Sequence, residues 1–294
     1  MRERSRILLG MNSLTSERQA AVIRALVEGN SLRATARLTG VARNTVSNLL
    51  RDLGSHCKNH HDRFVRDVSP KRVQMDEVWS FAKKKEGRVK LEERGTGVGD
   101  CWTWVAIDQD SKLVISYRVG SRDSRTGYAF VQDLADRLAS RCQLTSDGLP
   151  IYVRAVEKAF GWNGADFAQI VKIFGSDSGP EAGRRYSPAV CIGTEKHWIM
   201  GKPDMAYVST SHAERQNLTM RMQMRRFTRL TNAFSKKVEY HLYAVSLHYM
   251  HYNYCRVHTM LSKQYGVPTT PAMAAGLTDH VWSIHELLEL LQGN

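Results

Sequence analysis

The order of strand-like and helical runs after Pro70 constrains the fold of this chain more than any other feature. Short runs rich in β-branched and aromatic residues are typical of strands, and longer runs with apolar residues every three or four positions are typical of helices. In chain order they are strands at 73–81, 101–108 and 112–120, a helix at 124–140, a strand at 143–146, a helix at 150–160 and a strand at 169–174. Three consecutive strands followed by alternating helices and strands predict an α/β fold, a mixed sheet with flanking helices.

This β-β-β-α-β-α-β order is that of the RNase H-like fold, in which three antiparallel strands precede parallel ones. We therefore predict an RNase H-like domain. Within it, the charged stretch 82–99 is expected to form an exposed hairpin loop, and the Gly/Pro/Ser-rich stretch at about 176–208 an insertion. Three further helices are predicted at 211–227, 234–254 and roughly 279–291.

Ahead of the sheet, an all-α segment of three short helices is predicted between residues 15 and 53. Thr15 and Ser31 are suited to cap the first two, and a turn at Thr39-Gly40-Val41 leads into the third. A helix that braces a third helix with a polar face is the helix-turn-helix pattern, whose polar face can enter the major groove of DNA. That face carries Arg43, Asn44, Ser47, Asn48 and Arg51. The alternative interpretation is an ordinary three-helix core with a solvated face.

Residues 55–70 are polar and basic and are interpreted as a linker. Its His56, Cys57, His60 and His61 are potential zinc ligands, but a zinc site generally needs a second, separated ligand pair, and none is clear. A role in contacting phosphate is therefore preferred. The predicted domains are a helix-turn-helix domain at 1–54, the linker at 55–70, the RNase H-like domain at 71–265 and a C-terminal helical tail at 266–294.

The charge of the chain indicates a polyanionic partner. It has 42 Lys and Arg against 29 Asp and Glu, a formal net charge of +13, and residues 211–265 alone hold nine Lys and Arg against two Glu. Nucleic acid is the usual partner of such a stretch. A membrane surface would also attract it, but the sequence shows no long apolar run and no signal-peptide segment. Five scattered cysteines without CxxC spacing favour reduced thiols and a cytoplasmic location. A nucleic-acid partner would make the protein nucleoid-associated there.

Three acidic residues stand where a divalent metal could be held. Asp76 lies inside the first strand, Asp147 ends the fourth strand, and Glu214 is near the start of a basic helix. Metal-dependent phosphodiester cleavage uses two hard cations held by carboxylates on rigid elements. Each acid also has a local explanation. Asp76 could be an edge-strand acid with Glu77 as the outward residue, Asp147 could serve a turn, and the helix dipole favours Glu214. Asp108, beside a hairpin turn, is the main rival.

Three segments resemble the acidic motifs of the insertion sequence one family of transposases. They are residues 75–80 (MDEVWS), 145–148 (TSDG) and 211–217 (SHAERQN). Residues 252–258 (YNYCRVH) and 270–273 (TPAM) are similar to the ending shared by many insertion-sequence transposases. The resemblance, over about residues 30–276, implies a DDE transposase in which Asp76, Asp147 and Glu214 are catalytic and bind two Mg²⁺ ions, with Mn²⁺ as a substitute. Many members also carry a Cys-rich zinc finger, which this chain does not show.

The resemblance also implies a reaction and partners. A DDE transposase cleaves a phosphodiester at the end of its element, and the freed 3′-OH then attacks target DNA. Double-stranded DNA and a homodimer or higher oligomer are the expected partners, since two ends must be joined. Arg221, two helical turns after Glu214, matches a position at which such enzymes hold terminal DNA, and Arg225 extends that basic stripe.

Two other function classes stay open at this stage. Arg256 and His258 lie near Tyr252 and Tyr254 in the sequence, which gives a tyrosine recombinase some support. A DNA-binding regulator or domesticated transposase would use the helix-turn-helix without catalysis, although it would have no need for the complete set of acids. His212 is interpreted either as a hydrogen-bonding residue near the metals or as a buried structural histidine.

Overall fold

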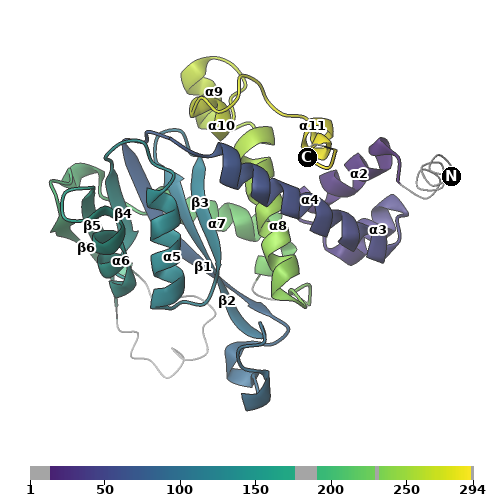
Figure 1. The fold of residues 1–294 in the computed structure, drawn as a ribbon, viewed down its shortest axis with the longest axis horizontal. Coiled ribbons are helices and arrows are strands. Elements are labelled where there is room, and N and C mark those ends of the chain that lie inside the picture. Colours follow the sequence, from purple (N-terminus) through teal and green to yellow (C-terminus); the bar gives the residue numbers. More distant parts are fainter. Residues whose placement is uncertain (1–13, 176–190, 229–231, 293–294) are drawn as a thin grey trace, which may run out of the picture. The chain divides into compact units, whose positions relative to one another are not determined.

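The computed structural model describes residues 14–175, 191–228 and 232–292 (Figure 1). The chain divides into two compact units, each built from separate stretches of sequence. A helical unit comprises Met1–Phe64, Ser80–Gly99 and Thr219–Asn294, and a sheet unit comprises Val65–Trp79 and Asp100–Leu218. Strand β1 and helix α7 each begin in the sheet unit and end in the helical unit.

The sheet unit is built on a six-stranded mixed sheet with the strand order β3-β2-β1-β4-β5-β6. The strands are β1 (Arg72–Ala82), β2 (Gly99–Asp108), β3 (Val114–Gly120), β4 (Gln143–Asp147), β5 (Asp166–Phe174) and β6 (Cys191–Met200). The pairs β1–β4 and β4–β5 are parallel, whereas β2–β3 and β5–β6 are antiparallel. The predicted α/β fold with a mixed sheet is therefore confirmed.

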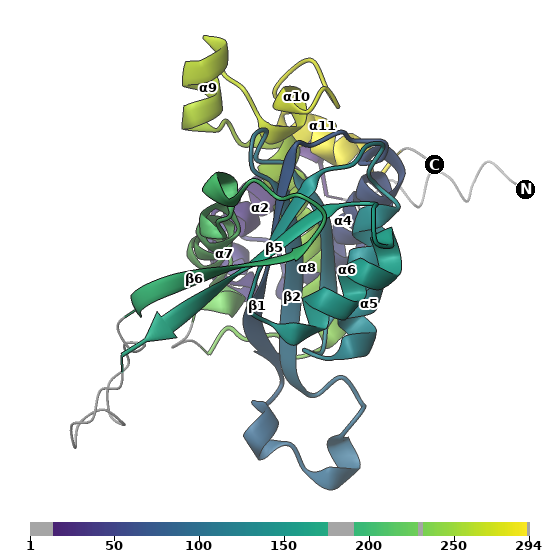
Figure 2. The same cartoon turned by 90° about the vertical axis from the view of Figure 1, so that its left-hand side faces the viewer.

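Helices α5 (Ser124–Ala135) and α6 (Pro150–Phe160) lie side by side along the sheet, as both views show (Figures 1 and 2). Asp123 caps α5, because its Oδ1 accepts a hydrogen bond from the backbone N–H of Thr126 at 2.8 Å. Gly127 allows the close packing, since a Cβ there would lie 2.4 Å from Ile151 of α6 and 3.3 Å from Trp104 of β2. These contacts cover the central strands, and residues 103–108 of β2 are buried on both faces.

The edge of the sheet differs from the sequence prediction. Residues 191–200, predicted as part of an insertion, form β6, which pairs antiparallel with β5. Most side chains of β6 are exposed, so the strand has no apolar alternation from which it could be predicted. Its backbone hydrogen bonds to β5 hold it in place. Of the rest of the predicted insertion, residues 176–190 lie outside the described residues, and residues 201–208 contain the 3₁₀ turn η4 (Met205–Tyr207).

The helical unit contains the three N-terminal helices at the predicted places. They are α2 (Ser16–Val27), α3 (Leu32–Thr39) and α4 (Arg43–Phe64). Thr15 and Ser31 cap α2 and α3, as predicted, through hydrogen bonds from Arg18 N and Ala34 N to their hydroxyl oxygens. These helices bury a core of Ala20, Val22, Ile23, Val46, Leu50 and Leu53.

Helix α4 extends through the first ten residues of the predicted linker, so the linker prediction is wrong as far as Phe64. The reason is packing of residues that look polar in the sequence. Cys57 and His61 are buried, and the His60 ring lies 4.4 Å from that of Phe64 and 5.3 Å from that of Trp282. These contacts hold α4 helical beyond the point where its apolar pattern ends.

The C-terminal helices of this unit include a long apolar helix packed against α4. They are α8 (Val238–Met250), continued by the π-helical turn η6 (His251–Cys255), α9 (Thr259–Tyr265), α10 (Pro271–Ala274) and α11 (Ile284–Glu289). Gly54 permits the α4–α8 approach, because a Cβ there would lie 2.5 Å from the backbone oxygen of Tyr243. In the described part of the chain, no helix has the length and apolar character needed to cross a membrane. All five cysteines are free thiols.

Candidate metal centre

Three carboxylates gather where two neighbouring parallel strands meet. Asp76 and Glu77 belong to β1, and Asp147 is the last residue of β4. The strands are paired with Met75 opposite Ser146, so the next positions, Asp76 and Asp147, are also neighbours across the sheet. One oxygen of each of the three carboxylates lies within 4.8 Å of one from the others. Among the described residues, this is the one group of three or more acidic, His or Cys side chains close enough to hold a metal ion.

Asp76 is the most perturbed acid of the group. Its Oδ1 accepts a hydrogen bond from Glu77 N at 2.9 Å, and its Oδ2 accepts one from Asn217 Nδ2 of α7 (Ser211–Gln223) at 2.8 Å. Burial, followed by the negative charges of Glu77 and Asp147, raises the pKa of Asp76 to about 7. Burial is the larger cause and the neighbouring negative charges add to it, and both effects favour a proton or a bound cation at this carboxylate.

Glu77 is a member of this group that the sequence did not predict. Its side chain is only 1% exposed, although the sequence allowed it to be the outward residue of the strand. Glu77 Oε1 accepts a hydrogen bond from Arg122 Nε at 2.7 Å, and Oε2 accepts one from the Tyr152 hydroxyl at 3.0 Å. Burial raises the pKa of Glu77, and Arg122 and Tyr152 oppose that rise. In the sequence, only its position next to Asp76 indicates that Glu77 belongs to this group.

Asp147 is held at the start of a tight turn and keeps one oxygen available. Its Oδ1 accepts a hydrogen bond from Leu149 N at 3.1 Å, and its Oδ2 lies 4.0 Å from Arg122 Nη2. The side chain is 37% exposed. Burial raises the pKa of Asp147, as it does for Asp76. A partly exposed carboxylate beside two others is suited to a ligand that enters from solvent.

Glu214 faces the same group, but another residue holds it. Its Oε1 accepts hydrogen bonds from Lys172 Nζ of β5 and from Thr210 Oγ1, both at 2.6 Å. After larger causes, chiefly burial, its charge contributes to the raised pKa of both Asp76 and Asp147. The structure thus brings two of the three predicted acids into one cluster and pairs the third with a lysine.

The start of α7 is fixed to β1 through Gln74. Gln74 Oε1 accepts hydrogen bonds from His212 N at 2.7 Å and Ala213 N at 3.2 Å. The His212 ring is half-buried and lies 3.4 Å from Lys112 Nζ. Asp108 serves its hairpin turn as turn chemistry predicts, since it accepts hydrogen bonds from Asp110 N and Ser111 N.

The residues predicted to bind DNA belong to two parts of the helical unit. Arg43, Asn44 and Ser47 line a groove, and Arg51 pairs with Asp52 at 2.8 Å beside Asn48. Arg221 is half-buried in α7. The prediction that Arg225 continues the same helix is wrong, because α7 ends at Gln223 and Arg225 begins the 3₁₀ turn η5 (Arg225–Phe227). The break follows from the burial of Met224 and Phe227, for which the chain turns inward.

Comparisons with known proteins give likenesses among solved structures. Neither a protein-family model nor a curated protein matches the chain. A Mos1 transposase paired-end complex is 16% identical, with 52% of this chain and 58% of that chain covered and a TM-score of 0.24. The Mos1 strand transfer complex is 17% identical, with coverages of 55% and 63% and a TM-score of 0.23. A piggyBac transposase synaptic complex with hairpin DNA is 10% identical, with coverages of 98% and 74% and a TM-score of 0.39. The chain spans less than two thirds of the Mos1 chains it matches.

Proposed function

We propose that this protein is a DNA transposase that cleaves phosphodiester bonds at transposon ends and transfers the freed 3′-OH into target DNA. The observation that carries the proposal is the cluster of Asp76, Glu77 and Asp147 on adjacent parallel strands. A cluster of carboxylates with raised pKa values is expensive to maintain, so it favours a function that uses the charge.

The donor set fits a hard divalent cation. Carboxylate oxygens are the ligands that Mg²⁺ and Mn²⁺ prefer, and no thiol or imidazole belongs to the cluster among the described residues. We assign the ligands as Asp76, Asp147 and Glu214, with two ions in the active state. Bound divalent ions would activate the attacking oxygen and stabilise the leaving oxygen of a phosphodiester.

The protein's own residues orient this site. Asn217 fixes one oxygen of Asp76, and the backbone of Leu149 fixes one oxygen of Asp147. Glu77 anchors Arg122, whose Nη2 also approaches Asp147. The Arg122 guanidinium would therefore lie beside a substrate phosphate bound at the cluster. Glu214 must exchange its ion pair with Lys172 for a metal, which an exposed pair permits at little cost.

The arrangement of the sheet supports an RNase H-like assignment. Its first five positions read β3-β2-β1-β4-β5, with the two clustered Asp residues on the adjacent strands β1 and β4. We also propose that α2, α3 and α4 form a helix-turn-helix and that Arg43, Asn44, Ser47, Asn48 and Arg51 contact DNA. Arg221 and Arg225 are proposed phosphate contacts.

Further parts of the proposal rest on the sequence. The acidic motifs suggest an enzyme of the insertion sequence one type, which acts as a homodimer or higher oligomer in the cytoplasm, in association with the nucleoid. A catalytically silent DNA-binding regulator is the second candidate. The Lys172–Glu214 ion pair is the observation in its favour, since a regulator that binds no metal would keep its third acid paired with a lysine.

The test is cleavage of the DNA that flanks this gene in its own genome. A supercoiled plasmid that carries this DNA is incubated with the protein in Mg²⁺, in Mn²⁺ and in a chelator. We expect nicks at the element's ends in both metals and none in the chelator. Binding of the same DNA without cleavage in either metal would favour the silent regulator.

A further inference from the structure

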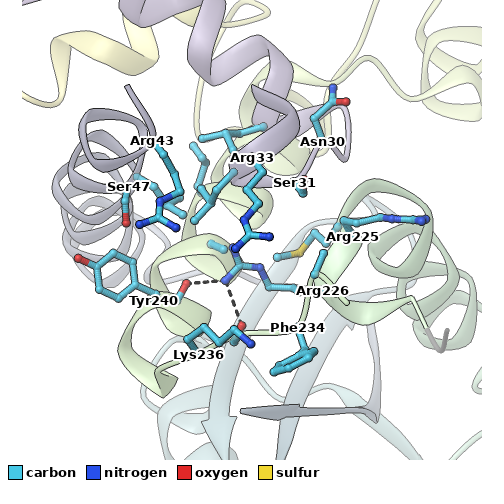
Figure 3. Close-up of a pocket in the computed structure, with 18 of the residues that line it drawn as sticks. Asn30, Ser31, Arg33, Arg43, Ser47, Arg225, Arg226, Phe234, Lys236 and Tyr240 are labelled. Carbon is cyan, nitrogen blue, oxygen red and sulfur yellow. Dashed lines mark hydrogen bonds between the residues drawn. The ribbon is translucent and has the colours of Figure 1, made fainter. Parts of the chain in front are cut away.

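A groove of about 1130 Å³ opens within the helical unit, between the N-terminal helices and the segment that leads into α8 (Figure 3). One wall comes from the end of α2, from α3 and from the start of α4. The other comes from residues 223–226, 232–237 and from α8 as far as His248. The groove is separate from the acidic cluster, and no residue of that cluster lines it.

The charge of the groove has one sign. Arg33, Arg37 and Arg43 line one wall, and Arg225, Arg226, Lys236 and Lys237 line the other. No Asp or Glu is among the described residues that line it. Figure 3 shows Arg33 and Arg43 directed towards the side of the groove that carries Arg226 and Lys236. Cations from two walls, without intervening acids, attract an anion from both sides.

Arg226 is the strongest sign that the anion has a defined place. Its Nη1 donates hydrogen bonds to the backbone oxygen of Tyr240 at 2.7 Å and to Ser235 Oγ at 3.2 Å. Both acceptors are neutral, and no carboxylate contacts this guanidinium in the part of the chain that the structure describes. Desolvation lowers the pKa of Arg226 to about 10. A desolvated cation without an acidic partner is costly, and a bound anion would remove that cost.

We propose that this groove binds the phosphodiester backbone of DNA, with Arg226 as its central phosphate contact. One guanidinium group can bind two phosphate oxygens at once through parallel hydrogen bonds. Asn44 and Ser47 add neutral donors on the wall opposite Arg226. The site rests on the proposed function only in so far as it takes DNA as the ligand. In this site Arg43, Asn44 and Ser47 contact the DNA backbone. Asn48 and Arg51 lie outside the groove and remain available to read bases.

The test measures how salt weakens binding to a short DNA duplex of arbitrary sequence, by fluorescence anisotropy in a metal chelator. Each phosphate contact contributes about 0.9 to the slope of log K against log salt for duplex DNA. We expect the double variant Lys236→Gln/Lys237→Gln and the single variant Arg226→Gln each to flatten this slope by about 1 or more. The matched control is Lys263→Gln, an exposed lysine of α9 outside the groove, which should leave the slope unchanged.

The proposal is overturned if the groove variants keep the slope of the Lys263→Gln protein. Because Arg226 is packed, its substitution can destabilise the fold, so the slope of Arg226→Gln is interpreted only if this variant melts at the wild-type temperature. Lys236 and Lys237 are exposed, so the double variant does not carry this risk of destabilisation. Inorganic phosphate, added at constant ionic strength, separates the sources of the anion. If phosphate raises the wild-type melting temperature but not that of Arg226→Gln, while the DNA slopes stay unchanged, the groove holds a free anion and not DNA. The assay contains a chelator and measures DNA binding alone, so a protein that cannot cleave DNA can still show the expected slopes.

Discussion

Lys172 Nζ lies 2.6 Å from Glu214 Oε1, so the third acid of the predicted triad is paired with a lysine of β5. Both side chains are more than one third exposed, at 38% and 40%. An ion pair so exposed contributes about 0–1 kcal/mol to stability, so a divalent cation can readily displace Lys172 from Glu214. Lys172 also helps to counter the rise in the pKa of Asp147 that burial causes, so its charge reaches the cluster as well.

Removal of this lysine should therefore tighten metal binding. We expect Lys172→Met to lower the Kd for Mn²⁺ by up to about fivefold, since Glu214 and Asp147 no longer share a fixed cation. Titration calorimetry without DNA measures the effect. Lys158→Met, at an exposed lysine of α6, is the control and should match the wild type. A weaker Mn²⁺ affinity in Lys172→Met would mean that Lys172 positions Glu214 for the metal.

The raised pKa of Asp76 makes stability depend on pH. In the folded protein without metal this pKa is about 7, against an ordinary value of 3.8. Between about pH 4 and 7 the folded state binds more protons than the unfolded state, so the free energy of unfolding falls as pH rises through this window. Asp76→Asn removes the titrating group. Its melting temperature should exceed that of the wild type by a margin that grows from pH 4 to pH 8, as measured by calorimetry in a chelator. A margin that does not change with pH would contradict the raised pKa.

The hydroxyl of Tyr152 supports the buried carboxylate of Glu77 at 3.0 Å. Tyr152→Phe leaves that oxygen without this donor, so we expect a loss of about 1–3 kcal/mol in the free energy of unfolding. Tyr254→Phe is the matched control, because the Tyr254 hydroxyl is buried without a hydrogen-bond partner among the described residues. Urea unfolding compares the two. Equal effects would show that the Tyr152 hydroxyl does not stabilise Glu77.

Arg43 and Arg51 share α4 but should differ in what they recognise. Arg51 lies outside the basic groove, and its variant Arg51→Ala should weaken binding to DNA from the element's ends about tenfold more than binding to unrelated duplex. Arg43 lines the groove, so Arg43→Ala should weaken both to the same extent. Anisotropy titrations on the two duplexes measure the ratio. The reverse pattern would place Arg43 in the major groove and Arg51 on phosphate.

The sequence predicts the central sheet well, because its strands are buried and strongly patterned. β1, β2 and β4 appear at the predicted places. Asp76 and Glu77 are the two acids among the apolar residues of β1, and they mark the cluster. β6 could not be predicted, since hydrogen bonds to β5 hold it while its side chains remain exposed.

The partners of the acids were also beyond prediction from sequence. Arg122 and Asn217 lie 45 and 141 positions from the acids they contact, so only the folded chain brings them together. The sequence left Glu77 open as an outward residue, because strict alternation assigns neighbouring strand residues to opposite faces. In β1 both faces are covered, and a residue on either can be buried.

Cleavage by Asp147→Asn and Asp108→Asn, side by side with the wild type, tests the central claim most directly. Asp147 belongs to the acidic cluster, whereas Asp108 serves a hairpin turn through Asp110 and Ser111. The substrate is duplex DNA that flanks the gene, in Mg²⁺ and under single-turnover conditions, with binding measured in parallel. We expect Asp147→Asn to bind this DNA but to give no product above the chelator background, and Asp108→Asn to cleave it. Wild-type cleavage by Asp147→Asn, with loss of cleavage in Asp108→Asn, would contradict the assignment of the metal centre.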